Sequence, residues 1–159
     1  MGRITNITVA GLGGQGVLKV TDILAEVLFA SGYDVKKSEV HGMSQRGGSV
    51  SSEVRFGDKV YSPMVPEGEA DVLAVLEPTQ VEVNAGKLKK GGVLIAPADL
   101  PLDKLSNPKA ANMVFLGAVA REFKDIPESV WLKHMHANLP EKLHAVNDVA
   151  FGLGYGARG

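Results

Sequence analysis

Closely spaced glycines in residues 11–16 have the pattern of a phosphate-binding turn, G-x-G-x-x-G. The residues of this turn are Gly11, Gly13, Gly14, Gln15 and Gly16. An apolar segment precedes them at 4–10 and apolar residues at helical spacing follow in 17–28, which predicts a strand that turns into a helix. Such a turn offers backbone N–H groups and the partial positive charge of a helix N-terminus to an anion. We therefore expect the turn to bind a phosphate, a sulfate or a carboxylate of a partner.

A second segment with recognition chemistry lies between two predicted strands. Its polar and glycine residues are His41, Ser44, Gln45, Arg46, Gly47 and Gly48. The Arg46 guanidinium is a rigid fork of donors, the two polar side chains before it can bind a polar group, and the paired glycines leave the backbone accessible. His41 could transfer a proton, but without a second catalytic residue beside it, a hydrogen bond within the loop is the favoured interpretation. From composition alone, a solvated connection is an equal alternative.

The glycine turn also raises the alternative of a free-standing nicotinamide- or flavin-binding domain. In that case Glu39, which lies 23 residues beyond Gly16, would bind a ribose hydroxyl. The chain of such a domain would continue into a helix at this point, whereas here it continues into the glycine-rich loop. A third possibility is a scaffold whose glycines serve only helix–strand packing.

The pattern of elements predicts an α/β fold: a three-layer, Rossmann-like, mostly parallel sheet with an antiparallel hairpin and a helical C-terminal third. Strands are expected at 4–10, 33–40, 49–56, 70–76 and 92–96, with a hairpin partner at 59–62 after a turn at 57–58. Helices are expected at 17–31, 78–90 and 107–123, and after Pro127 and Pro140. The glycines of 152–156 follow no strand, so a frayed tail is expected there rather than a phosphate loop.

Composition indicates a single domain over residues 1–159 and excludes several functions. The net charge of −1 does not favour nucleic acid or an anionic membrane as a partner, and no segment is long and apolar enough to cross a bilayer. The start of the chain lacks an apolar signal segment, so a cytoplasmic protein is expected. Without cysteine, the usual thiolate ligands of iron–sulfur clusters are absent. We expect no metal site, because His134, His136 and His144 have no carboxylate or thiol at ligand spacing.

Several motifs together resemble a known family. They are GLGGQGV at 11–17, SEVHGMSQRGGSV at 38–50, VRFG at 54–57, PEGEAD at 66–71, EP at 77–78, NMVFLGA at 112–118 and AFGLG at 150–154. Their order resembles the gamma subunit or domain of 2-oxoacid:ferredoxin oxidoreductases, and within that family the beta subunit of the indolepyruvate type. Residues 97–107 are shorter than the family pattern, which has room there for another strand and loop. The helix after Pro78 also departs from the usual version.

The resemblance implies a small subunit of a complex that oxidatively decarboxylates a 2-oxoacid to an acyl-coenzyme A. It implies that a larger catalytic partner carries thiamine diphosphate and iron–sulfur clusters, that the complex uses coenzyme A, and that electrons pass to ferredoxin. The isolated chain is then expected to bind none of these cofactors and to be inactive, with no catalytic residue of its own. Its glycine turn and the loop from His41 to Gly48 would contact the partner or a cofactor.

Overall fold

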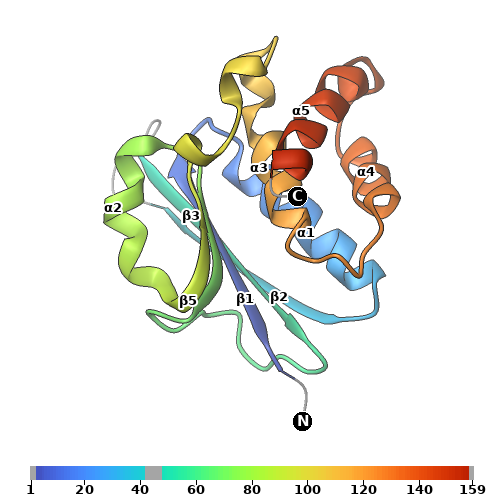
Figure 1. Cartoon of the computed structure of the whole chain (residues 1–159). Coiled ribbons are helices and arrows are strands. Elements are labelled where there is room, and N and C mark those ends of the chain that lie inside the picture. The colour runs from blue at the N-terminus through green and yellow to red at the C-terminus, as the bar shows by residue number, and fades with distance from the viewer. Residues whose placement is uncertain (1–2, 42–47, 158–159) are drawn as a thin grey trace.

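The computed structural model describes residues 3–41 and 48–157, which form one five-stranded sheet between two unequal layers (Figure 1). The strand order is β2-β3-β1-β4-β5. The strands are β1 (Thr5–Leu12), β2 (Asp34–His41), β3 (Ser49–Gly57), β4 (Ala70–Val75) and β5 (Leu88–Ile95). The three-layer α/β architecture predicted from the sequence is therefore confirmed.

The sheet is evenly mixed rather than mostly parallel. β1 pairs with β4 and β4 with β5 in parallel, whereas β3 is antiparallel to both β1 and β2. β2 runs in the same direction as β1, as expected, but β3 lies between them. The hairpin expected between 49–56 and 59–62 is wrong, since β3 uses both of its edges for β1 and β2. Residues 59–62 instead belong to an irregular connection from β3 to β4.

A helical layer covers one face of the sheet (Figure 1). Its helices are α1 (Val17–Ala30), α3 (Ala111–Ala120), α4 (Glu128–Ala137) and α5 (His144–Ala157), with one-turn 3₁₀ helices at Pro97–Asp99, Leu102–Lys104, Pro108–Ala110 and Glu141–Leu143. Eight consecutive residues of α3, Met113 to Ala120, are buried, because α3 lies between the sheet and α5. The largest buried side chains of this layer are Phe115, Trp131 and Phe151. This layer forms most of the core.

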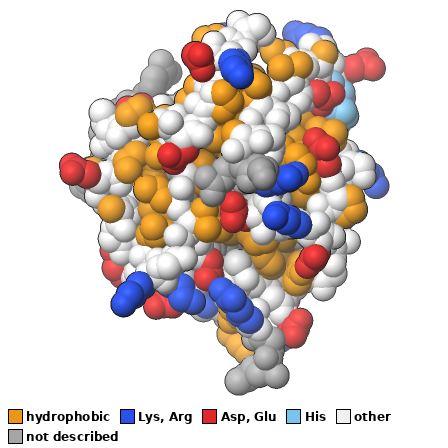
Figure 2. All heavy atoms as spheres, in the orientation of Figure 1, with side chains coloured by type: hydrophobic (Ala, Val, Ile, Leu, Met, Phe, Trp, Pro, Cys, Tyr) orange, Lys and Arg blue, Asp and Glu red, His pale blue; other side chains and the backbone are white. Residues whose placement is uncertain are grey.

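The other face of the sheet has a thin cover. The helix predicted at 78–90 is instead a series of short turns: 3₁₀ helices at Pro78–Gln80 and Ala85–Lys87 flank the one-turn α2 (Val81–Asn84). These turns place Val81 over a small buried cluster of Ala10, Leu73 and Val75. Figure 2 shows hydrophobic side chains gathered over α2, at the left of the view. Within the described residues, no helix is long and apolar enough to cross a membrane.

The C-terminal glycines lie within a packed helix, so the frayed tail expected at 152–156 is wrong. A Cβ added to Gly154 would overlap the carbonyl oxygen of Val114, and one added to Gly117 would overlap that of Phe151. The two glycines therefore let the backbones of α3 and α5 come into direct contact. Close packing between the helices outweighs the low helix propensity of glycine.

Candidate functional site

The glycine turn lies where β1 ends, at the carboxyl ends of the parallel strands. Leu12 still pairs with Ser49 of β3, and the chain then turns into α1. Gly14 and Gly16 have φ angles of +91° and +82°, a region that favours glycine. Gly16 is the N-cap of α1, and no side chain caps this helix. The predicted strand–turn–helix is therefore confirmed.

Several amides of the turn already have partners within the chain. The Leu12 N–H donates to Oε1 of Gln15 at 2.8 Å, and the Gly13 N–H donates to the Gly48 carbonyl at 2.8 Å. A Cβ on Gly11 would come within 2.7 Å of the same Gln15 oxygen, so Gly11 makes room for this side chain. The Gln15 carboxamide thus satisfies a backbone N–H of the turn from within the chain. The amides of Leu12 and Gly13 do not serve an external anion in this arrangement.

Glu77, which sequence reasoning did not single out as a site residue, holds Gln15 in place. The Gln15 Nε2 donates to Oε1 of Glu77 at 2.8 Å, while the backbone N–H and hydroxyl of Thr79 donate to Oε2 at 3.3 and 3.1 Å. The Thr79 N–H, then the Gln15 amide and the Thr79 hydroxyl, hold the pKa of Glu77 below its usual range. Glu77 is therefore a carboxylate at neutral pH, and it places negative charge on this side of the turn.

The other side of the turn faces a cleft of about 490 Å³. Its lining includes Gly14, Gly16 and the first turn of α1, Val17 to Lys19. Amides in the first turn of a helix have no partner within the helix, and the first turn of α1 contains no acidic residue. Lys19 lines the cleft, and its Nζ donates to the Asn138 carbonyl at 3.2 Å. This cleft is the part of the turn whose charge and donors suit a carboxylate or a phosphate.

A smaller cleft of about 300 Å³ adjoins the turn from the side of α3. Asn112, at the start of α3, lines it and donates from Nδ2 to the Gly16 carbonyl at 3.4 Å. A Cβ on Gly16 would overlap this Asn112 amide. Asn112 thus links the turn to the helical layer. In the sequence, Asn112 is the first residue of the family motif NMVFLGA, and Glu77 is the first residue of the motif EP at 77–78. These two motifs are the sequence signals that could have pointed to both residues.

The structure describes only the ends of the second predicted segment. The backbone of His41 pairs with Val50 at the end of β2, and the Gly48 carbonyl accepts the bond from Gly13. This hydrogen bond therefore joins the two candidate segments directly, although Gly48 lies 32 positions beyond Gly16 in the chain. Ser44, Gln45, Arg46 and Gly47 lie outside the described residues, and their predicted contacts stay predictions.

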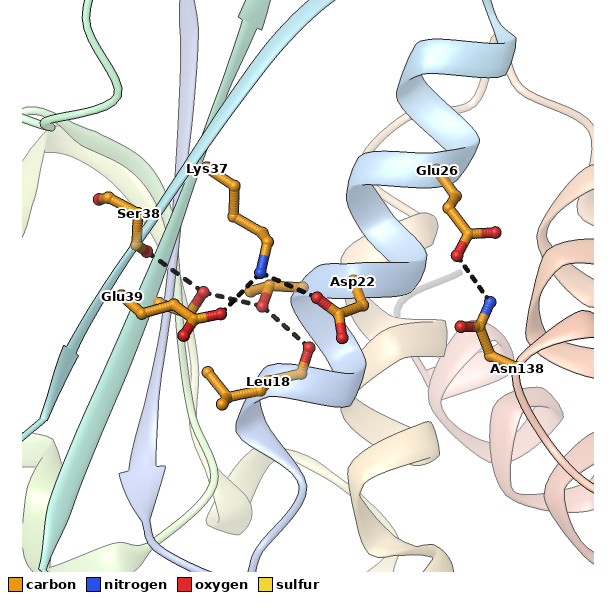
Figure 3. A network of polar contacts seen from close by, with 9 residues as sticks. Leu18, Asp22, Glu26, Lys37, Ser38, Glu39 and Asn138 are labelled. Carbon is orange, nitrogen blue, oxygen red and sulfur yellow. Dashed lines mark hydrogen bonds and ion pairs between the residues drawn. The ribbon is translucent and has the colours of Figure 1, made fainter.

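Glu39 is in the wrong place for a nicotinamide ribose. It pairs with Ser52 of β3, which in turn pairs with Val9, so β3 separates Glu39 from the strand that carries the glycine turn. Figure 3 shows Glu39 beside Lys37, whose Nζ contacts Glu39 at 2.7 Å and Asp22 at 2.8 Å. Partial burial works to lower the pKa of Lys37, but the bonds to these two carboxylates outweigh it and raise the pKa. The geometry does not favour the free-standing dinucleotide-binding alternative.

The histidines of the C-terminal helices make structural contacts. His134 contacts Glu26 of α1 at 3.3 Å, and His136 contacts Asp148 of α5 at 2.5 Å. The ring of His144 stacks on that of His136 at 4.2 Å, and its Nε2 donates to the carbonyls of His136 and Leu139. Across the ranges 3–41 and 48–157, no group of three or more His, Asp or Glu side chains could hold a metal ion.

Comparison with known proteins agrees with this geometry. The family model for pyruvate ferredoxin/flavodoxin oxidoreductase matches residues 6–157. The chain belongs to this family. Indolepyruvate oxidoreductase subunit IorB of Pyrococcus horikoshii is 50% identical over 93 residues, which are 58% of this chain and 46% of that relative. The chain thus spans about half the length of this relative in the match.

Two solved structures have the same fold. The gamma subunit of a keto/oxoacid ferredoxin oxidoreductase from Geobacter sulfurreducens superposes with a TM-score of 0.80 and 24% identity, over 98% of this chain and 97% of that one. The 2-oxoglutarate:ferredoxin oxidoreductase of Magnetococcus marinus also gives a TM-score of 0.80, with 23% identity. The match covers 98% of this chain but only 31% of the Magnetococcus marinus chain. The same fold therefore occurs both as a separate chain and as one part of a longer chain.

Proposed function

We propose that this chain is the small subunit of a cytoplasmic 2-oxoacid:ferredoxin oxidoreductase of the indolepyruvate type. A larger subunit supplies the reaction centre, in which an arylpyruvate is decarboxylated and oxidised to an acyl-coenzyme A and ferredoxin receives the electrons. The observation that carries this proposal is the 50% identity to an indolepyruvate oxidoreductase subunit over 93 residues. The Geobacter sulfurreducens gamma subunit has the same fold over almost the whole of both chains, which supports the role of a small subunit.

The residues of this chain decide which cofactors it could contact. Iron–sulfur clusters do not fit, because the sequence contains no cysteine. A phosphate of coenzyme A or a carboxylate of the larger subunit fits the cleft beside Gly14 and Gly16, where the start of α1 has no acidic residue and Lys19 adds positive charge. In this role the chain binds and orients a group at the edge of the partner's site, and performs no step of the reaction itself.

Reconstitution tests this function. The larger subunit from the same organism is prepared with its cofactors, and reduction of a viologen dye is measured with indolepyruvate and coenzyme A. We expect no dye reduction by the small chain alone, and coenzyme A-dependent reduction when the two subunits are mixed. Dye reduction by the small chain alone would refute the assignment, as would full activity of the larger subunit without it.

Arg46 provides a second test within the same assay. In the sequence, Arg46 lies between the residues of β2 and those of β3, and a guanidinium is a fork of donors that suits a carboxylate or phosphate. Arg46→Ala is expected to leave the fold intact and to weaken assembly or coenzyme A-dependent turnover roughly tenfold or more. Lysine should restore only part of the loss, because a point charge lacks the fork. Unchanged affinity and turnover in Arg46→Ala would show that the loop is only a connection.

A further inference from the structure

The thinly covered face of the sheet exposes large hydrophobic side chains. Val40 is 55% exposed, Tyr61 85%, Met64 64% and Val83 71%, and we call these four residues the apolar patch. Val40 lies on the same side of β2 as Ser38, whose hydroxyl donates to the Pro63 carbonyl, whereas Lys37 points to α1 on the other side. Val40 and Val83 line the same groove, and exposed hydrophobic surface of this kind marks protein–protein contact sites.

The segment that carries Tyr61 and Met64 is fixed to the sheet. The Arg55 Nη1 donates to the carbonyls of Ser62 and Met64 at 2.9 Å each, and its Nε donates to Asn6 of β1. The Val65 N–H donates to a Glu53 carboxylate oxygen at 3.3 Å. The two side chains are therefore exposed on an ordered segment, which lowers the conformational entropy lost when a partner binds.

A groove of about 180 Å³ separates the end of β2 from α2. Val40 lies on one side of it and Val83 on the other, and Asn84, fixed by a bond from Nδ2 to the Gln80 carbonyl at 2.8 Å, also lines it. Among the described residues that line the groove, Lys87 alone carries charge, and its Nζ lies 3.4 Å from the Ser51 hydroxyl. The groove thus suits an apolar side chain with a carboxylate beside it.

We propose that the apolar patch and this groove are where the larger subunit docks, a proposal that rests on the function proposed above. In the Magnetococcus marinus enzyme this fold makes up 31% of a longer chain, so the remainder is joined to it covalently. When the same fold is a separate chain, noncovalent contacts must replace that connection. The helical layer also exposes Phe29 of α1 and Val149 of α5, but four exposed hydrophobic side chains, two of them beside a groove, lie on the thinly covered side of the sheet.

Charged substitutions in the patch test this docking site. Val83→Asp and Val40→Asp are each expected to raise the Kd for the larger subunit at least tenfold, because a carboxylate would be buried against an apolar surface. Val149→Asp is the matched control, since Val149 is 59% exposed but lies on α5 in the helical layer. Lys87→Met should weaken binding and make the Kd less dependent on salt. Thermal melting of each isolated variant checks that it is folded.

The outcomes separate this site from the proposed function. If the wild-type chain and Val149→Asp bind and both patch variants bind weakly, the docking site is supported. If the patch variants bind as tightly as wild type, or if only Val149→Asp binds weakly, the site is refuted while the proposed function stands. If the wild-type chain does not bind the larger subunit at all, the proposed function fails and the docking site fails with it.

Discussion

Gly154→Ala is expected to lower the free energy of unfolding by about 3 kcal/mol, which corresponds to a melting temperature roughly 6–12 °C lower. The new Cβ would overlap the Val114 carbonyl oxygen and come within 2.9 Å of the Ala118 nitrogen. Both atoms belong to the backbone of α3, so no flexible side chain can move aside. The helices α3 and α5 would have to separate, and the packing of Phe115 and Phe151 would be disturbed with them. Urea unfolding of the isolated chain, followed by circular dichroism, measures the change.

Gly152→Ala is the matched control on the same helix. Nothing lies within 4 Å of the position its Cβ would take, and alanine is the better helix former. This variant is expected to be as stable as wild type or more stable, by up to about 1 kcal/mol. If Gly154→Ala were no less stable than Gly152→Ala, then α3 and α5 do not pack backbone against backbone, and the C-terminal glycines have another role.

These glycines show what sequence reasoning can and cannot recover. The strand β1 and the helix α1 were predictable because an uninterrupted apolar run and a helical repeat of apolar residues are local patterns. The helix at Gly152 to Gly156 was not predictable, because it is stabilised by contact with a helix about 35 residues earlier rather than by its own propensity. Sequence spacing gave no sign that α3 would approach so closely.

The position of β3 was missed for a related reason. Residues 49–56 were correctly predicted as a strand, but alternation along a strand does not say which neighbours it pairs with. β3 pairs on both sides, with β1 and β2, and this leaves no edge for residues 59–62. The same insertion of β3 moves Glu39 away from the glycine turn. A single pairing choice therefore decides against the nicotinamide alternative.

The turn itself was located correctly, but its internal bonding depends on distant residues. Glu77 lies 62 positions from Gln15, and Asn112 lies 96 positions from Gly16. Neither contact can be deduced from the spacing of glycines. The consequence is functional, since Gln15 satisfies the Leu12 amide and leaves the α1 side of the turn as the face that can receive an external group.

Gly16→Ala is expected to destabilise the chain by about 3 kcal/mol, through two separate effects. A φ of +82° costs a residue with a Cβ about 1–2 kcal/mol. The overlap with the Asn112 amide adds an overpacking cost of about 1–3 kcal/mol. Gly14→Ala separates the two effects, because Gly14 has a φ of +91° but nothing within 4 Å of its Cβ position. That control should show the backbone cost alone, measured by urea unfolding.

A double-mutant cycle with Asn112→Ala then tests the contact directly. In the Asn112→Ala background the amide is gone, so Gly16→Ala should cost little more than Gly14→Ala does in wild type. The remaining Asn112 Cβ position, 3.2 Å from the new Cβ, leaves a small residual penalty. If Gly16→Ala costs the same with and without the Asn112 amide, then Asn112 does not hold the turn. The cleft beside α1 would in that case owe its shape to the glycine backbone alone, and substitutions at Asn112 would leave assembly with the larger subunit unchanged.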